Sequence, residues 1–299
     1  MNCKDEAGKN TSLTLDARAK INLTLDVTGV REDGYHLVRM LMQSISLHDT
    51  VTLTVRETPG ISLETDSRAI PADSSNLMWK AAERMFSVCG ISPGLDMKLQ
   101  KRIPAAAGLA GGSTDAAAVM LGINRLFRLG LSREELMRLA LPLGADIPYC
   151  ILGGTALAEG IGEVLTPLPE MPACTILLAR PEIEVSTGWV YRTLDSTPVL
   201  RHPDTGEALL ALREGQLSRL AACMENVLEQ VTVPAHPVVE EIRRQMLESG
   251  ALGARMSGSG PTVFGIFSDR AAARTALETV QQAGLATQAM LAEPVPAEK

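Results

Sequence analysis

Residues 104–118 constrain the fold of this chain most, because they join a strand pattern to a helix pattern through a loop of glycine and alanine. Upstream, residues 95–100 alternate between apolar and polar side chains, the period of a strand with one buried face. Downstream, apolar residues recur at helical spacing, and Ser113, Thr114 and Asp115 carry the short polar side chains that cap a helix start. The stretch therefore predicts a strand, a glycine loop and a helix N-terminus.

This loop has the properties of an anion site. The first turn of a helix has unpaired N–H groups and a partial positive charge, both of which stabilise an anion such as phosphate. Gly108, Gly111 and Gly112 would let the backbone approach a ligand closely. No lysine follows Gly112 and the glycine spacing is not G-x-G-x-x-G, so neither common nucleotide motif applies. The loop alone leaves two interpretations open, a phosphate site and a tight connection packed with small residues.

Length and charge restrict the class of protein. A chain of 299 residues with 45% hydrophobic and 21% charged residues is long enough for two domains. The net charge of −7 disfavours a nucleic-acid partner. No apolar stretch of about 18 residues occurs, and residues 1–10 carry mixed charges, so we expect a cytoplasmic protein without a membrane partner.

Cysteine and histidine residues are scattered, which disfavours both a disulfide framework and a zinc site. They are Cys3, Cys89, Cys150, Cys174, Cys223, His36, His48, His202 and His236. The identity of any metal ligand stays unknown at this point.

The first part of the chain predicts strands with a polar turn between them. Residues 11–27 alternate apolar and polar side chains, so Lys20 and Asn22 project from the same face of one strand. The commoner fate of such a pair is a solvated outer face. After an Asp-Gly turn, Tyr35 and His36 stand side by side. They could stack on a heterocycle, or pack against the apolar segment that follows.

Further along, cap patterns predict a helix that ends at Gly90 and another that starts with a capping box at Ser132. Residues 144–150 are expected to run into a strand-like segment, interrupted by glycine, that continues through Glu159. Asp146 lies in a turn, where carboxylates usually cap backbone amides.

Proline density around residues 166–172 suggests a domain boundary. Beyond it we expect a strand at 175–179 and helices near 186–191, 206–213, 216–228 and 237–249. A second glycine-rich stretch at 253–267 reads as strand, tight loop and strand, followed by a helix at 269–283 and a last strand. This half predicts an α/β plait with an antiparallel sheet.

Together, the glycine stretches at 104–114 and 253–262 resemble those of the GHMP small-molecule kinases. The resemblance implies an α+β fold of two domains. Residues 1–168 would form an N-terminal ATP-binding domain of mixed sheet plus helices. Residues 169–299 would form a C-terminal, substrate-side domain, the plait.

Three further motifs, at 19–23, 31–36 and 144–148, resemble the branch of this superfamily that acts in the non-mevalonate isoprenoid pathway. Membership implies transfer of the ATP γ-phosphoryl to the 2-hydroxyl of a cytidine diphosphate-linked methylerythritol, with ATP and Mg²⁺ as cofactors. The partner would be this small molecule, and the protein a monomer or homodimer.

The resemblance also implies roles for individual residues. Lys20 and Asp146 match the catalytic pair, with Asp146 either accepting the proton of the hydroxyl or only orienting it. Substrate-side candidates are Asn22, Tyr35, His36, Tyr191, Gly258 and Ser259. Nucleotide-side candidates are Asn76, Lys101, Pro104, Ala105, Ala106, Ala107, Gly108, Leu109, Ala110, Gly111, Gly112, Ser113 and Thr114.

One position departs from the superfamily pattern. Ala110 stands where many members have glycine or serine, and we expect its φ to be negative so that the methyl group is accommodated. Alternatives stay open: another GHMP kinase of the homoserine or mevalonate type, a non-catalytic nucleotide-binding relative, or a structural role for both glycine loops.

Overall fold

The computed structural model describes residues 11–298, and backbone contacts divide them into two compact units. The first contains residues 11–18, 48–105 and 111–152, and the second contains residues 19–47, 106–110 and 153–298. The units interleave along the chain, because two long strands each contribute to both. The domain boundary expected after residue 168 follows chain order and stays a prediction. The charge pattern of residues 1–10 and Cys3 lies outside the described residues.

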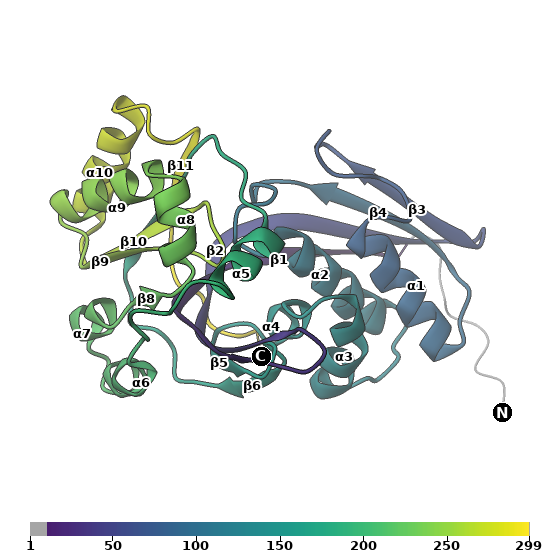
Figure 1. Ribbon diagram of the computed structural model, residues 1–299. Coiled ribbons are helices and arrows are strands. Elements are labelled where there is room, and N and C mark those ends of the chain that lie inside the picture. Colours follow the sequence, from purple (N-terminus) through teal and green to yellow (C-terminus); the bar gives the residue numbers. More distant parts are fainter. Residues whose placement is uncertain (1–10, 299) are drawn as a thin grey trace. The chain divides into compact units, whose positions relative to one another are not determined.

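The first unit has helices packed on a sheet (Figure 1). Its strands are the first part of β1 (Ser12–Val30), the last part of β2 (His36–Arg56), β3 (Gly60–Thr65) and β4 (Gly94–Gln100). Its helices are α1 (Leu77–Cys89), α2 (Gly111–Leu126), α3 (Arg133–Ala140), the 3₁₀ turn η1 (Leu141–Leu143) and α4 (Ile147–Leu152). Strand β4 pairs antiparallel with β2 and parallel with β3.

The apolar face of β4 forms the core of this unit. Leu95, Met97 and Leu99 are buried in one cluster with Met78 of α1 and Ala117 of α2. The alternation at residues 95–100 therefore marks a strand with one buried face, as predicted.

The ends of the helices in the first unit follow the cap patterns. Asn76 caps α1, its side-chain Oδ1 accepting the N–H of Met78, and Gly90 ends the helix with φ +63°. Ser132 and Glu135 form the predicted capping box of α3.

The second unit contains the rest of β1 (Ser12–Val30) and of β2, together with two sheet regions. In one region, β2 pairs antiparallel with β5 (Thr155–Glu159), β5 pairs with β6 (Val164–Pro167), and β1 pairs parallel with β8 (Glu225–Asn226). The other region is an antiparallel sheet in the order β11 (Gln288–Ala292), β7 (Thr175–Arg180), β10 (Val263–Phe267) and β9 (Gly253–Met256).

Helices α9 (Val238–Glu248) and α10 (Arg270–Gln282) pack on this antiparallel sheet (Figure 1). The sheet and its helices confirm the predicted α/β plait. The remaining helices of the unit are α5 (Thr187–Leu194), α6 (Thr205–Arg213), α7 (Leu217–Ala222) and α8 (Glu229–Ala235). Among residues 11–298, no helix has the length and apolar character needed to cross a membrane.

Two local predictions are wrong. Helix α2 begins at Gly111, so Ser113, Thr114 and Asp115 lie inside its first turns instead of capping it. The expected helix at 216–228 ends at Ala222, because residues 225–226 pair with β1, an interaction that local periodicity cannot reveal. The expected strand-like segment through Glu159 is present as β5, and α4 precedes it.

Candidate active site

Lys20 and Asn22 are buried in the second unit, with 4% and 1% of their surface exposed. The Lys20 ammonium donates hydrogen bonds to Asn22 Oδ1 at 2.8 Å and to the Gly108 carbonyl oxygen at 3.1 Å. Lys20 and Asn22 therefore do not lie on a solvated outer face of the strand, which is the more common location of such a pair. An ammonium has three donors, and Lys20 finds two acceptors within residues 11–298, so one donor is available to a ligand.

The two glycine loops meet at the Gly108 carbonyl oxygen. Ser257 donates its hydroxyl to this oxygen at 3.0 Å, so the oxygen accepts from Ser257 and from Lys20. Gly108 has φ +75°, and a Cβ on it would lie 2.1 Å from the Ser257 carbonyl oxygen. A Cβ on Gly258 would lie 3.4 Å from the Lys20 nitrogen. The approach of these backbones requires glycine at position 108.

The loop before α2 contains two alanines in the left-handed region. Ala106 has φ +49° and Ala110 has φ +59°, so the expectation of a negative φ at Ala110 is wrong. A side chain at such a φ costs about 1–2 kcal/mol per residue. Ala107 and Leu109 of the same loop are buried.

The N-terminus of α2 follows this loop directly. No acceptor in the described part of the chain takes the backbone N–H groups of Gly111, Gly112 and Ser113. The Thr114 hydroxyl donates to the Arg18 carbonyl oxygen at 2.8 Å, which anchors the first turn to β1 in the first unit. Unpaired N–H groups at a helix start can bind phosphate oxygens.

Asp146 lies in the first unit, in the turn that leads into α4, and is half-buried. Its backbone carbonyl accepts the N–H of Cys150 at 3.1 Å. Its carboxylate has no hydrogen-bond partner among residues 11–298, so it is not the backbone cap that such turn carboxylates usually form. The carboxylate is chemically available to a hydroxyl of a ligand.

Lys101 is held by two buried carboxylates of the first unit. Its ammonium donates to Asp115 at 2.8 Å and to Asp49, whose side chain is fully buried. Burial alone would lower the pKa of Lys101, but the charges of Asp115 and Asp49 raise it. Asp49 also accepts the N–H groups of Arg102 and Ile103 at 2.5 and 2.8 Å.

Asp115 has one buried oxygen, Oδ1, without a partner in the described residues. Burial raises the pKa of Asp115 to about 7, although the Lys101 ammonium acts in the opposite direction. A Cβ on Gly111 would lie 2.9 Å from the Lys101 nitrogen. The Lys101, Asp49 and Asp115 cluster therefore joins the chain before the glycine loop to the chain after it.

Asn76 uses its side-chain amide within the protein. Besides capping α1, it donates from Nδ2 to the Pro71 carbonyl oxygen at 2.7 Å. A role for Asn76 beside a nucleotide stays a prediction.

His36 and Tyr191 come together in the second unit. Their ring centroids are 4.7 Å apart at an interplanar angle of 42°. His36 Nε2 lies 2.7 Å from Asp195 Oδ1, which holds the imidazole in place. Tyr35 precedes them and is 60% exposed, a large fraction for an aromatic side chain. The exposed ring can stack on a planar ligand.

The second glycine loop also contacts α5. The Ser259 hydroxyl lies 2.7 Å from the Thr187 hydroxyl at the start of this helix, and Ser259 is 7% exposed. Gly258 has φ +58°, a conformation that favours glycine.

Four contacting residues were not singled out from the sequence. They are Asp49, Asp195, Ser257 and Thr187. Each of these residues lies far along the chain from the residue that it contacts, so no local sequence pattern predicts the contact. Within residues 11–298, no group of three or more His, Cys, Asp or Glu side chains could hold a metal ion.

Comparison with protein families places known domains on both halves. The family described as "GHMP kinases N terminal domain" matches residues 76–154, and "GHMP kinases C terminal" matches residues 208–286.

Named relatives cover nearly the whole chain. A 4-diphosphocytidyl-2-C-methyl-D-erythritol kinase of Lachnospira eligens is 48% identical over 282 residues, which is 94% of this chain and 98% of the relative. The protein of the same name from Alkaliphilus oremlandii is 50% identical over 265 residues, covering 88% of this chain and 91% of the relative.

Solved structures agree with these relatives. The crystal structure of a 4-(cytidine 5'-diphospho)-2C-methyl-D-erythritol kinase superposes with a TM-score of 0.79 at 32% identity, covering 96% of this chain and all of the other. The homoserine kinase of Cytophaga hutchinsonii gives a TM-score of 0.77 at 19% identity, covering 100% of this chain and 98% of the other. This second likeness bears on the fold alone.

Proposed function

The chain belongs to the 4-diphosphocytidyl-2-C-methyl-D-erythritol kinases of the GHMP family, and on that premise we propose how its own residues perform the reaction. The protein transfers the γ-phosphoryl group of ATP to the 2-hydroxyl of 4-diphosphocytidyl-2-C-methyl-D-erythritol. A bond forms between the substrate oxygen and the γ-phosphorus, the bond from that phosphorus to ADP breaks, and the hydroxyl proton leaves.

One observation carries this function most directly. The Lys20 ammonium is buried against the Gly108 carbonyl oxygen with a donor to spare, at the point where both glycine loops meet. Phosphoryl transfer requires positive charge and exact positioning more than covalent chemistry by the protein. A buried, held ammonium is suited to both needs.

We assign the nucleotide phosphates to the loop at 104–114. The unpaired N–H groups at the start of α2 and the close approach allowed by Gly108 support this assignment. Lys101 and Asn76 border the site in this proposal and act by shaping it, since hydrogen bonds to protein groups hold their side chains in place.

Asp146 is the residue that we assign to the substrate hydroxyl. Its carboxylate has no partner among residues 11–298, so it can orient the hydroxyl and accept the proton. In a loose transition state, the bond from the substrate oxygen to phosphorus forms late. The hydroxyl therefore has to lose its proton only late in the reaction. Asp146 therefore orients the hydroxyl first and accepts the proton as the reaction ends.

Mg²⁺ is the metal that we assign to the bound ATP. The lack of a three-residue metal cluster within residues 11–298 fits an ion held mainly by phosphates and water, as magnesium commonly is. When bound, the ion would neutralise negative charge on the phosphates, and the Lys20 ammonium supplies further positive charge from the protein.

The cytidine end is assigned to the turn that contains Tyr35 and His36. The exposed ring of Tyr35 is available for stacking, and Tyr191 contacts the His36 ring. Asn22 and Gly258 are assigned to the substrate because they adjoin Lys20, and Ser259 because it follows Gly258 in the loop. A cytoplasmic location, a monomeric or homodimeric state and the lack of a nucleic-acid partner remain proposals, the last favoured by the net charge of −7.

The function is tested with the purified protein, ATP, Mg²⁺ and a panel of acceptors. We expect a phosphorylated product, detected by mass, with 4-diphosphocytidyl-2-C-methyl-D-erythritol and not with homoserine or mevalonate. Phosphorylation of homoserine or mevalonate alone would identify another GHMP kinase. ATP binding by calorimetry without any product would identify a non-catalytic relative.

A further inference from the structure

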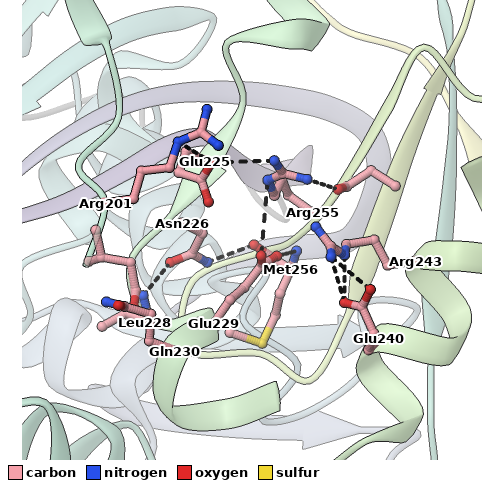
Figure 2. Close-up of polar contacts among 12 residues, drawn as sticks. Arg201, Glu225, Asn226, Leu228, Glu229, Gln230, Glu240, Arg243, Arg255 and Met256 are labelled. Atoms are coloured by element: carbon pink, nitrogen blue, oxygen red, sulfur yellow. Dashed lines mark hydrogen bonds and ion pairs between the residues drawn. The ribbon is translucent and has the colours of Figure 1, made fainter. Parts of the chain in front are cut away.

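Asn226 is buried in the second unit, and the reaction as described above does not use it. It lies on β8 beside Leu25 of β1 and is 1% exposed. Its Nδ2 donates to the carbonyl oxygens of Met256 and Gly258, both at 2.8 Å, and its Oδ1 accepts the N–H of Leu228 at 3.0 Å. Figure 2 shows the amide between Leu228 and Met256. The two carbonyl acceptors require the NH₂ group on their side, which sets the orientation of the amide.

Glu229, three residues after Asn226 in the chain, also binds Met256 of β9. Its Oε1 accepts the N–H of Met256 at 2.7 Å, so Asn226 and Glu229 together engage both backbone groups of Met256 (Figure 2). Burial raises the pKa of Glu229, while the Met256 N–H and Arg255 oppose this rise. Strand β9 is the edge of its sheet, and such an edge leaves backbone groups to be satisfied by other segments.

The backbone that Asn226 holds continues directly into the second glycine loop. Ser257 of this loop binds the Gly108 carbonyl oxygen, and Gly258 lies against the Lys20 ammonium. The loop therefore contacts both the Lys20 ammonium and the carbonyl oxygen that accepts its hydrogen bond. An unbroken series of contacts leads from Asn226 through Gly258 to Lys20.

We propose that Asn226 is a positioning residue for phosphoryl transfer, acting through the Met256–Gly260 backbone to fix Gly108 and Lys20. The proposal rests on the proposed function, because the groups that Asn226 would hold in position are the ones assigned to phosphoryl transfer. It goes beyond that function in identifying a residue on β8 that contacts neither glycine-loop side chains nor Lys20 itself.

Asn226→Ala tests the proposal, with Gln230→Ala as the matched control. The Gln230 side chain also forms hydrogen bonds, but none to the glycine loop. Its Oε1 accepts the N–H of Leu200 at 2.8 Å, and its Nε2 donates to the Val227 carbonyl oxygen at 3.4 Å. We expect Asn226→Ala to weaken ATP binding about tenfold and to lower kcat about tenfold, because buried carbonyls of the loop lose their donor. The KM for the acceptor alcohol is expected to rise as well, because Gly258 and Ser259 of the same loop are assigned to the substrate. Gln230→Ala is expected to change none of these constants.

Calorimetric titration with ATP alone keeps this test separate from the identity of the acceptor. If wild-type protein yields no product, the proposed function fails, while the ATP affinities still decide the role of Asn226. Unchanged ATP affinity in a folded Asn226→Ala protein would overturn the proposal and leave Asn226 a purely structural residue.

Ser257→Ala provides a second route should Asn226→Ala not fold. It cuts the same series of contacts at the Gly108 carbonyl, so we expect a similar loss of ATP affinity. In the double variant the two losses are expected to be less than additive, since both act on one loop. Full additivity, or unchanged ATP affinity in Ser257→Ala, would contradict the proposal.

Discussion

The buried cluster of Lys101, Asp49 and Asp115 makes the stability of the protein depend on pH in a way that Asp115→Asn tests. The cluster contains two carboxylates and one ammonium, and Asp115 is 3% exposed with its Oδ1 unpartnered in the described residues. Burial raises the pKa of Asp115 from 3.8 to about 7. The ionised form is thus the costly one in the folded protein.

The direction in which stability changes with pH follows from the raised pKa of Asp115. The stabilising contribution of Asp115 is fully present below about pH 4 and is lost as pH rises through about 7. A rise of this size corresponds to about 4 kcal/mol in all, of which roughly 2–3 kcal/mol falls between pH 5 and 8. Asparagine has nearly the shape of aspartate and cannot ionise, so Asp115→Asn does not lose this stability as the pH rises.

Urea unfolding at intervals from pH 5 to pH 8 measures the effect. The free energy of unfolding of Asp115→Asn minus that of wild type is expected to rise by about 2–3 kcal/mol across this range. A flat difference for Asp115→Asn would refute the reasoning.

Three further predictions concern the loops and the cytidine end. Tyr35→Ala should raise the KM for the cytidyl substrate by at least about tenfold, since base–aromatic stacking contributes about 1–3 kcal/mol; an unchanged KM in steady-state assays would contradict the stacking role. Gly108→Ala should abolish measurable ATP binding by calorimetry, because its Cβ would lie 2.1 Å from the Ser257 carbonyl oxygen. Gly29→Ala, whose Cβ would meet only Leu37 at 3.7 Å, is the control, and ATP affinity equal in both variants would argue against the close approach. Ala110→Gly should raise the free energy of unfolding by up to about 1 kcal/mol in urea titrations, because it removes a left-handed alanine; a loss of stability would show that the loop is not strained.

Local patterns predicted much of the fold. The alternation around Lys20 predicted β1, and the short polar residues at Asn76 and Ser132 predicted helix starts that the structure has. These features depend on neighbours within a few residues, which is why the sequence alone reveals them.

Contacts between distant segments could not be predicted in the same way. Residues 225–226 look helical by themselves, and only pairing with β1 makes them a strand. The burial of Lys20 depends on Gly108, which lies 88 residues further along the chain. The positive φ of Ala110 is likewise not predicted by its residue type, because alanine rarely adopts this conformation. The candidate site could therefore be proposed from motifs, while its buried partners required the structure.

The role of Asp146 is tested most directly by the turnover of Asp146→Asn with ATP, Mg²⁺ and 4-diphosphocytidyl-2-C-methyl-D-erythritol, followed by mass detection of the phosphorylated product. The account predicts that kcat falls by at least about 100-fold, the scale of a positioned acid–base group, while ATP affinity and the free energy of unfolding stay close to wild type. Turnover close to that of wild type would remove Asp146 from the mechanism and contradict the account.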